Sequence, residues 1–146
     1  VVPVREGIRQ LEAEGLVTFE RNVGARVFMV DVTKYGDTMQ TLALLEAAAT
    51  ALSAPHLTEA DLSEARTING RMRDQLDRLV PHDFTTLNHR FHATLARRCP
   101  NERLMELVEG EWTRLDNLRD STFTVVPERA VNSVAEHAHL IHLVES

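Results

Sequence analysis

The 146-residue sequence has little of several features that would mark large classes of protein. Its single cysteine, Cys99, cannot close an internal disulfide, which excludes a disulfide-stapled miniprotein and fits a reducing compartment. No apolar run approaches the roughly 18 residues needed to cross a bilayer, and the first residues lack the pattern of a secretory signal. Lysine is almost absent, since Lys34 is the only one. We therefore expect a cytoplasmic protein without a membrane partner.

What is present is the composition of a folded, acidic protein. Hydrophobic residues make up 43% and charged residues 26%, which is enough to build a core. The net charge is −6, and all of it lies after position 30, because the first 30 residues balance four arginines with four glutamates. An acidic body is a poor general binder of polyanions. Any contact with nucleic acid must therefore come from a few arginines near the N-terminus.

The first 30 residues predict a helix followed by a hairpin. Pro3 suits a first helical turn, apolar residues then recur at helical spacing, and Gly15 is a typical stop. Two β-prone runs, 16–19 and 25–30, flank a turn that contains Asn22 and Gly24, which is the pattern of a β-hairpin. This unit is too small to fold alone, so we expect further structure upstream of it.

From about position 37 onward the pattern is helical throughout. Helical periodicity and capping residues predict five amphipathic helices, and short connections favour an antiparallel bundle. The expected starts are Asp37, Thr58 with a capping box, Asp83, Asn101 and Pro127. The fold class is thus mostly α, with the boundary between the two units near 30–36, where Gly36 lies.

A helix followed by a two-stranded wing is half of a winged helix-turn-helix, whose helix enters the major groove. Arginine fits the guanine edge best, so Arg5 near the helix start is the candidate base reader. Arg9 lies one turn later, within reach of a phosphate or a base. Arg21 and Gly24 at the wing tip allow close approach to the DNA backbone. The alternative is a surface helix and hairpin whose arginines are simply solvated.

The stretch PVREGIRQLEAEGLVTFERNVGARV resembles the end of the winged-helix domain of GntR-family bacterial transcription regulators. The resemblance implies that residues 1–32 are a partial DNA-binding domain, holding the recognition helix and the wing. The first two helices of that motif are not in this sequence, so we expect no DNA binding by this piece alone. The positions that match the family are Pro3, Arg5, Glu6, Arg9, Leu11, Gly15, Leu16 and Gly24.

The seven histidines raise the question of a metal site. Asn88 and His92 are one turn apart on the same side of the predicted helix 83–99, and His137 faces the interior from the last helix. If those two helices dock antiparallel, the three side chains approach one another and can hold one divalent ion. Zn, Ni, Fe and Mn are not distinguished by these ligands. Helix geometry turns His89, His139 and His142 away.

The alternative for these residues is that they are ordinary core histidines with no metal. Ring nitrogens of His92 and His137 more than about 8 Å apart would be too far for bonds to a shared ion. Full burial of both rings with no room between them would also indicate core histidines that bind no metal.

Three segments, LLEAAATALSAPHLTEADL, LNHRFHATLARRCPNERL and SVAEHAHLIHLVE, resemble the all-helical effector (FCD) domain of the FadR-type branch of GntR regulators. The resemblance covers residues 37–146 and implies effector binding and dimerisation. It implies a divalent metal held by Asn88, His92 and His137, with a small carboxylate effector bound to the metal. A third histidine would lie beyond Ser146, and Leu42 stands where many relatives carry an arginine.

The sequence is therefore interpreted as part of a DNA-binding transcription regulator and not as an enzyme. A carboxylate metabolite would shift the arrangement of two winged-helix units in a homodimer that reads a palindromic operator. Two alternatives stay open. One is a metal-dependent hydrolytic enzyme, for which no general base is evident beside the histidines, since Glu136 should point away. The other is a helical dimerisation module that binds no ligand.

Overall fold

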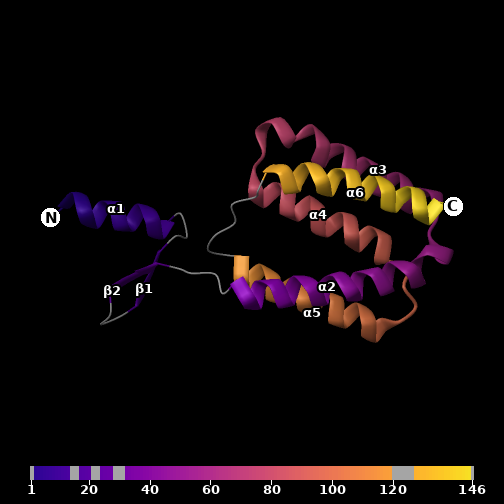
Figure 1. Ribbon diagram of the computed structural model, residues 1–146, viewed down its shortest axis with the longest axis horizontal. Coiled ribbons are helices and arrows are strands. Elements are labelled where there is room, and N and C mark those ends of the chain that lie inside the picture. Colours follow the sequence, from indigo (N-terminus) through magenta and orange to yellow (C-terminus); the bar gives the residue numbers. More distant parts are fainter. Residues whose placement is uncertain (1, 14–16, 21–23, 28–31, 120–126, 146) are drawn as a thin grey trace.

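The computed structural model describes residues 2–13, 17–20, 24–27, 32–119 and 127–145. Within these ranges the chain is mostly α-helical, with one two-stranded sheet, as expected (Figure 1). No helix in these ranges combines the length and the apolarity that a membrane span requires. The elements are α1 (Val2–Ala13), β1 (Val17–Glu20), β2 (Gly24–Val27), α2 (Val32–Ser53), α3 (Glu59–Asp74), α4 (Pro81–Ala96), α5 (Glu102–Arg119) and α6 (Pro127–Glu145).

The N-terminal unit is the expected helix and hairpin. Strands β1 and β2 pair antiparallel, with Val17 opposite Val27 and Glu20 opposite Gly24, and α1 packs against β1. Gly24 has a φ of 102°, a left-handed conformation that favours glycine at the first residue of β2. Arg21 lies outside the described residues.

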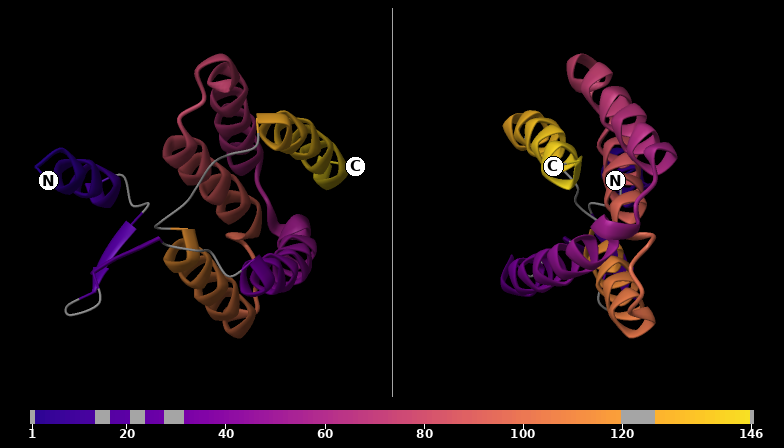
Figure 2. Two further views of the ribbon diagram at one scale, coloured as in Figure 1. Left: turned by 60° about the vertical axis from the view of Figure 1, so that its left-hand side comes forward. Right: turned by 90° about the vertical axis from the view of Figure 1, so that its right-hand side faces the viewer.

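Helices α2 to α6 alternate in direction and form the expected antiparallel bundle (Figure 1). Helix α3 packs against α4 and α6, whereas α2 packs against α5 and α4. Figure 2 shows α2 and α5 together at one side of the bundle and α3, α4 and α6 at the other. Each group has a hydrophobic cluster, and the cluster of α2 and α5 also includes Ala96 at the end of α4. One consists of Ala65, Ile68, Met72, Phe84, Leu87, Phe91, Leu95, Ala130 and Ile141, and the other of Leu42, Ala49, Ala96, Val108, Trp112 and Leu115.

Two of the expected helix caps are confirmed. The Thr58 hydroxyl accepts a hydrogen bond from the Asp61 amide at 3.3 Å, and Asp61 Oδ2 accepts one from the Thr58 amide at 2.9 Å. This is the reciprocal capping box that the sequence predicts. Asn101 Oδ1 accepts a bond from the Leu104 amide at 3.0 Å, which caps α5.

Two other expected helix starts are wrong. Helix α2 begins at Val32, so Gly36 and Asp37 lie inside it instead of before it. Helix α4 begins at Pro81, and Asp83 lies in its first turn. Proline needs no partner for its missing N–H at the first position, and a carboxylate in the first turn is stabilised by the helix dipole. Asp83 therefore supports this helix start without capping it.

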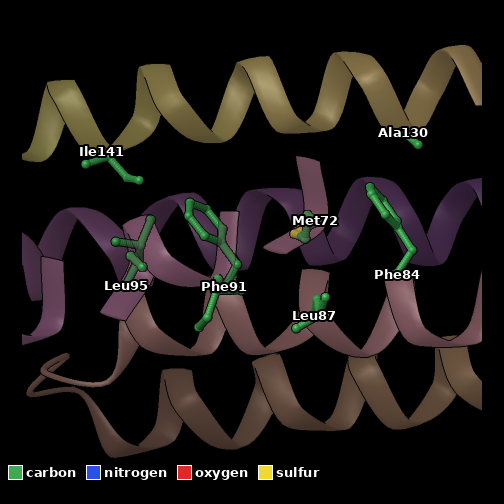
Figure 3. Close-up of a cluster of buried hydrophobic side chains, with 9 residues drawn as sticks. Met72, Phe84, Leu87, Phe91, Leu95, Ala130 and Ile141 are labelled. Carbon is green, nitrogen blue, oxygen red and sulfur yellow. The ribbon is translucent and has the colours of Figure 1, made fainter. Parts of the chain in front are cut away.

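The expected antiparallel docking of α6 on α4 is also wrong, because the two helices run parallel. Phe84 lies toward Ala130 at one end of the cluster and Leu95 toward Ile141 at the other (Figure 3). The reason is topological. When consecutive helices alternate in direction, α4 and α6 have α5 between them in the chain and must point the same way.

Candidate functional site

The candidate site lies where the two hydrophobic clusters meet, and each bundle helix contributes one side chain to it. Asn69 contacts His137, Glu46 contacts both His92 and Trp112, and the two histidine rings contact each other. The five are Glu46 from α2, Asn69 from α3, His92 from α4, Trp112 from α5 and His137 from α6.

The two histidines that the sequence singled out are brought together. The ring centroids of His92 and His137 are 5.0 Å apart, and the ring planes are nearly perpendicular at 84°. Two imidazoles bound at about 2.1 Å to one tetrahedral ion would have centroids roughly 5 Å apart. The pair is therefore well inside the limit for a shared ion, and its spacing fits a metal site.

His137 is held from two sides in the interior. Its side chain is 3% exposed, and its ring stacks on Phe91 with centroids 3.9 Å apart. Its Nδ1 lies 3.2 Å from Asn69 Oδ1. Burial lowers the pKa of His137 to about 3, with a smaller contribution from His92. The imidazole is therefore neutral near pH 7, which is the form that binds metals.

His92 is partly buried beside a carboxylate. Its side chain is 21% exposed, and its Nδ1 lies 3.5 Å from Glu46 Oε2. Burial lowers the pKa of His92 to about 4, so this ring is neutral near pH 7 as well. Two neutral imidazoles thus face each other between α4 and α6.

Glu46 is the acidic member of the group. Trp112 donates its Nε1–H to Glu46 Oε1 at 2.8 Å, and the carboxylate side chain is only 13% exposed. Burial raises the pKa of Glu46 to about 7, although the bond from Trp112 lowers it in part. Near neutral pH this carboxyl group is therefore poised between its two protonation states.

The remaining predicted ligand is Asn88, and three further histidines were expected to lie outside the site. Asn88 is half-buried on α4 and forms no hydrogen bond to either histidine within the described residues. The His89 ring stacks on Trp112 with centroids 4.2 Å apart, and among the described residues no ring contact joins it to His92 or His137. His139 and His142 are exposed. In the part of the chain that the structure describes, no group of three or more His, Cys, Asp or Glu side chains is placed to hold an ion.

The two imidazoles therefore supply part of a metal coordination shell. A complete shell would need the Asn88 amide and an oxygen from water or from a carboxylate ligand. Leu42, which stands where many relatives have an arginine, is 2% exposed and belongs to the α2–α5 cluster. It contributes apolar surface and no charge to the neighbourhood of Glu46.

The residues predicted from the sequence did not include Asn69, Glu46 and Trp112, although the sequence carries a signal for Asn69 and Glu46. Polar residues interrupt stripes that are otherwise apolar and helically spaced, and a polar residue on a buried face needs a hydrogen-bond partner. The stripes are Leu62, Ala65, Asn69 and Met72 on α3, and Leu42, Glu46, Ala49 and Ser53 on α2.

The candidate DNA-contacting residues lie far from this site in the chain. Arg5 and Arg9 are exposed on α1, and Gly24 is the first residue of β2. Exposure is necessary for a DNA contact, and it does not distinguish one from a solvated arginine. The DNA-reading role of these residues stays a prediction.

Comparison with known proteins agrees with this architecture. Residues 37–146 match the FCD domain family. A GntR-family transcriptional regulator from Pseudomonas syringae pv. tomato is 30% identical, with a TM-score of 0.51 over 99% of this chain and 68% of the other. The Listeria monocytogenes protein Lar, described as controlling expression of the agr system, is 21% identical, with a TM-score of 0.63 over 98% and 68%.

A third solved structure, Escherichia coli McbR/YncC, is 20% identical, with a TM-score of 0.66 over 99% of this chain and 73% of the other. The likeness to this protein and to Lar is evidence for the fold alone. No protein with a curated description matches the sequence significantly.

Proposed function

This chain belongs to the GntR family of transcription regulators with an FCD domain, and from that membership we propose that a metal-bound carboxylate metabolite controls its action on DNA. The observation that carries the proposal is the pair of neutral imidazoles, His92 and His137, 5.0 Å apart between α4 and α6. Such a regulator works in the cytoplasm, where the DNA is.

The residues present fit a divalent ion in part. His92 and His137 would bind it through ring nitrogens, and Asn88 on the same side of α4 as His92 is the candidate third ligand. A divalent ion, when bound, supplies a positive charge on which a carboxylate can bind. The histidines contribute no charge of their own, since burial keeps both rings neutral.

The position of the site suggests how a ligand acts on the whole protein. All five bundle helices contribute side chains there, so an effector that changes the ring contacts between α4 and α6 also acts on α2 and α3, which pack against them. An effector regulates only if it binds one arrangement of the protein better than another. In a homodimer with two winged-helix units, the two arrangements would differ in how well they match a palindromic operator.

Calorimetric titration with Zn²⁺ tests the site, using the wild-type chain and the variants His92→Ala, His137→Ala and His142→Ala. We expect a single Zn²⁺ site that either of the first two substitutions weakens at least about tenfold. His142→Ala is the matched control, because His142 is exposed on the same helix as His137 and should leave the affinity unchanged. Thermal unfolding with Zn²⁺ and succinate should then show a higher Tm than with Zn²⁺ alone.

Equal Zn²⁺ affinity in all four proteins would contradict the proposed ligands. Purified protein with no metal, no Zn²⁺ affinity and no response to carboxylates would favour the ligand-free dimerisation module.

The hydrolytic alternative gains one observation from the structure. Glu46 lies beside His92 with a pKa raised to about 7, and a buried carboxylate of that pKa can act as a general base. The sequence-based prediction did not include Glu46 as such a base. Regulation remains the proposal because the GntR-family relative is a transcriptional regulator. Turnover of a simple ester by the Zn²⁺-loaded protein, lost in Glu46→Gln, would favour hydrolysis instead.

A further inference from the structure

The side-chain amide of Asn69 has its orientation fixed by the backbone of α6. Its Nδ2 lies 3.0 Å from the carbonyl oxygen of Val134, and Asn69 is 8% exposed. A carbonyl oxygen can only accept a hydrogen bond, so the Asn69 atom that faces it must be the amino group. The reverse orientation would place two oxygens against each other in a buried site. Asn69 Oδ1 therefore points to the other neighbour, His137.

This orientation determines which ring nitrogen of His137 carries the proton. Asn69 Oδ1 lies 3.2 Å from His137 Nδ1, and a carbonyl-type oxygen has no hydrogen to donate. The hydrogen bond therefore requires a proton on Nδ1. A neutral imidazole has one N–H, so Nε2 is left with its lone pair.

The ring has little freedom to escape this arrangement. His137 is 3% exposed, and Phe91 stacks on it with an angle of 13° between the ring planes. Val134 and His137 are one helical turn apart on α6, so a single amide from α3 bonds to both. Rotating the imidazole or the amide would break one of these two buried hydrogen bonds.

We propose that Asn69 is a positioning residue that holds His137 in its Nδ1–H form, so that Nε2 is the ring atom free to bind a metal. The metal part of this proposal rests on the proposed function, whereas the protonation of the ring does not. Histidines that bind metals commonly donate their other N–H to a carbonyl or carboxylate oxygen, which fixes the ring and its tautomer. Asn69 gives His137 such a partner before any metal arrives.

Nitrogen-15 NMR of the histidine-labelled, metal-free chain measures the tautomer directly, since protonated and unprotonated ring nitrogens have different chemical shifts. The His137 signals are assigned by their loss in His137→Gln. We expect the wild type near pH 7 to carry the proton on Nδ1. Asn69→Leu removes the acceptor and should move the population toward Nε2–H. Asn69→Asp keeps an acceptor oxygen and should restore Nδ1–H.

The matched control is Thr94→Val. Thr94 is a buried polar residue on α4 whose hydroxyl donates to the Arg90 carbonyl oxygen, so its loss disturbs the bundle without touching His137. This variant should keep the wild-type tautomer. In calorimetric titrations with Zn²⁺, Asn69→Leu should bind about 10–100-fold more weakly than the wild type, while Thr94→Val should not.

A wild-type His137 protonated on Nε2 would overturn the proposal. So would an unchanged tautomer in folded Asn69→Leu, or the same change of tautomer in Thr94→Val. Should the wild type bind no Zn²⁺, the proposed function fails, and the metal-free spectra still decide whether Asn69 sets the tautomer. Weakened Zn²⁺ binding by Asn69→Leu with an unchanged tautomer would show a merely structural role.

Discussion

Burial acts in opposite directions on the three ionisable side chains of the site. It lowers the pKa of His92 to about 4 and of His137 to about 3, and it raises the pKa of Glu46 to about 7. In each case the buried environment disfavours the charged form. His92 and His137 are therefore neutral near pH 7, and the Glu46 carboxyl group takes up a proton at a higher pH than an exposed glutamate does.

These shifts predict opposite effects on stability. The unfolded chain binds more protons than the folded one at His137 between about pH 3 and 6.5, so this contribution to stability is lost as the pH falls through that range. The contribution of Glu46 to stability changes with pH in the opposite direction, since its pKa in the folded protein lies above the unfolded value of 4.5. Its contribution is present at low pH and is lost as the pH rises toward 7.

Replacing His137 by leucine should make the stability of the metal-free protein less sensitive to acid. We expect the free energy of unfolding of the wild type to lose about 1–2 kcal/mol from His137 between pH 6.5 and 5. His137→Leu should lack this loss and keep the similar trend of His92 and the opposing trend of Glu46. Urea denaturation at several pH values, with a chelator present, measures the difference. Identical pH profiles for the two proteins would contradict the burial assigned to this ring.

At the scale of single elements, the helix starts depend on a few local hydrogen bonds. The Thr58–Asp61 capping box also ties α3 to α4, because Asp61 Oδ1 pairs with Arg97 and Oδ2 with Arg98. Hydrogen bonds from the Thr58 amide and hydroxyl, with a smaller contribution from Arg98, hold the pKa of the Asp61 carboxyl well below its usual range. The start of α3 is thereby linked to the end of α4.

Thr58→Ala should destabilise the protein by about 0.5–2 kcal/mol, since it removes one half of the capping box. Urea denaturation near pH 7 measures this cost. Thr67→Ala is the matched control in the same helix, because Thr67 is exposed and its hydroxyl donates to the carbonyl oxygen of Ser63 within α3. If Thr67→Ala lowered the free energy of unfolding as much as Thr58→Ala does, the capping box would contribute no more to stability than an ordinary hydroxyl on the helix.

Several helix starts and caps could be predicted from the sequence, because each depends on residues within one turn. The starts of α2 and α4 were misplaced because the prediction relied on such local signals alone. Asp37 and Asp83 look like caps locally, yet α2 already begins at Val32, with Tyr35 packed against its hydrophobic cluster, and Pro81 already begins α4. The relative direction of α4 and α6 was also misjudged, since it follows from the number of helices between them and from no local pattern.

At the scale of the whole molecule, the proposed regulator needs two copies of the chain. DNA reading by paired winged helices requires a two-fold arrangement. We expect the full-length protein to have the mass of a dimer in light scattering at micromolar concentration. A strictly monomeric mass would count against the proposed mode of operator binding.

The DNA contact is tested in a protein that carries a complete winged-helix domain. There, Arg5→Ala should weaken operator binding by about 1–3 kcal/mol and relax the sequence preference, because a base contact is lost. Arg103→Ala is the matched control, since Arg103 is equally charged and exposed but lies on α5. Unchanged affinity and preference in Arg5→Ala would show that this helix does not read the operator.

The sequence by itself determined the helical fold class, the hairpin and the inward faces on which His92 and His137 lie. These features follow from periodicity and capping, which act within a few residues of the chain. Only the tertiary structure decided which side chains meet those histidines. Asn69 lies 68 residues from His137, and Glu46 lies 66 residues from Trp112, so no local pattern connects them. Their contacts depend on how α2, α3 and α5 pack around α4 and α6, and packing is set by the shapes of all five helices together.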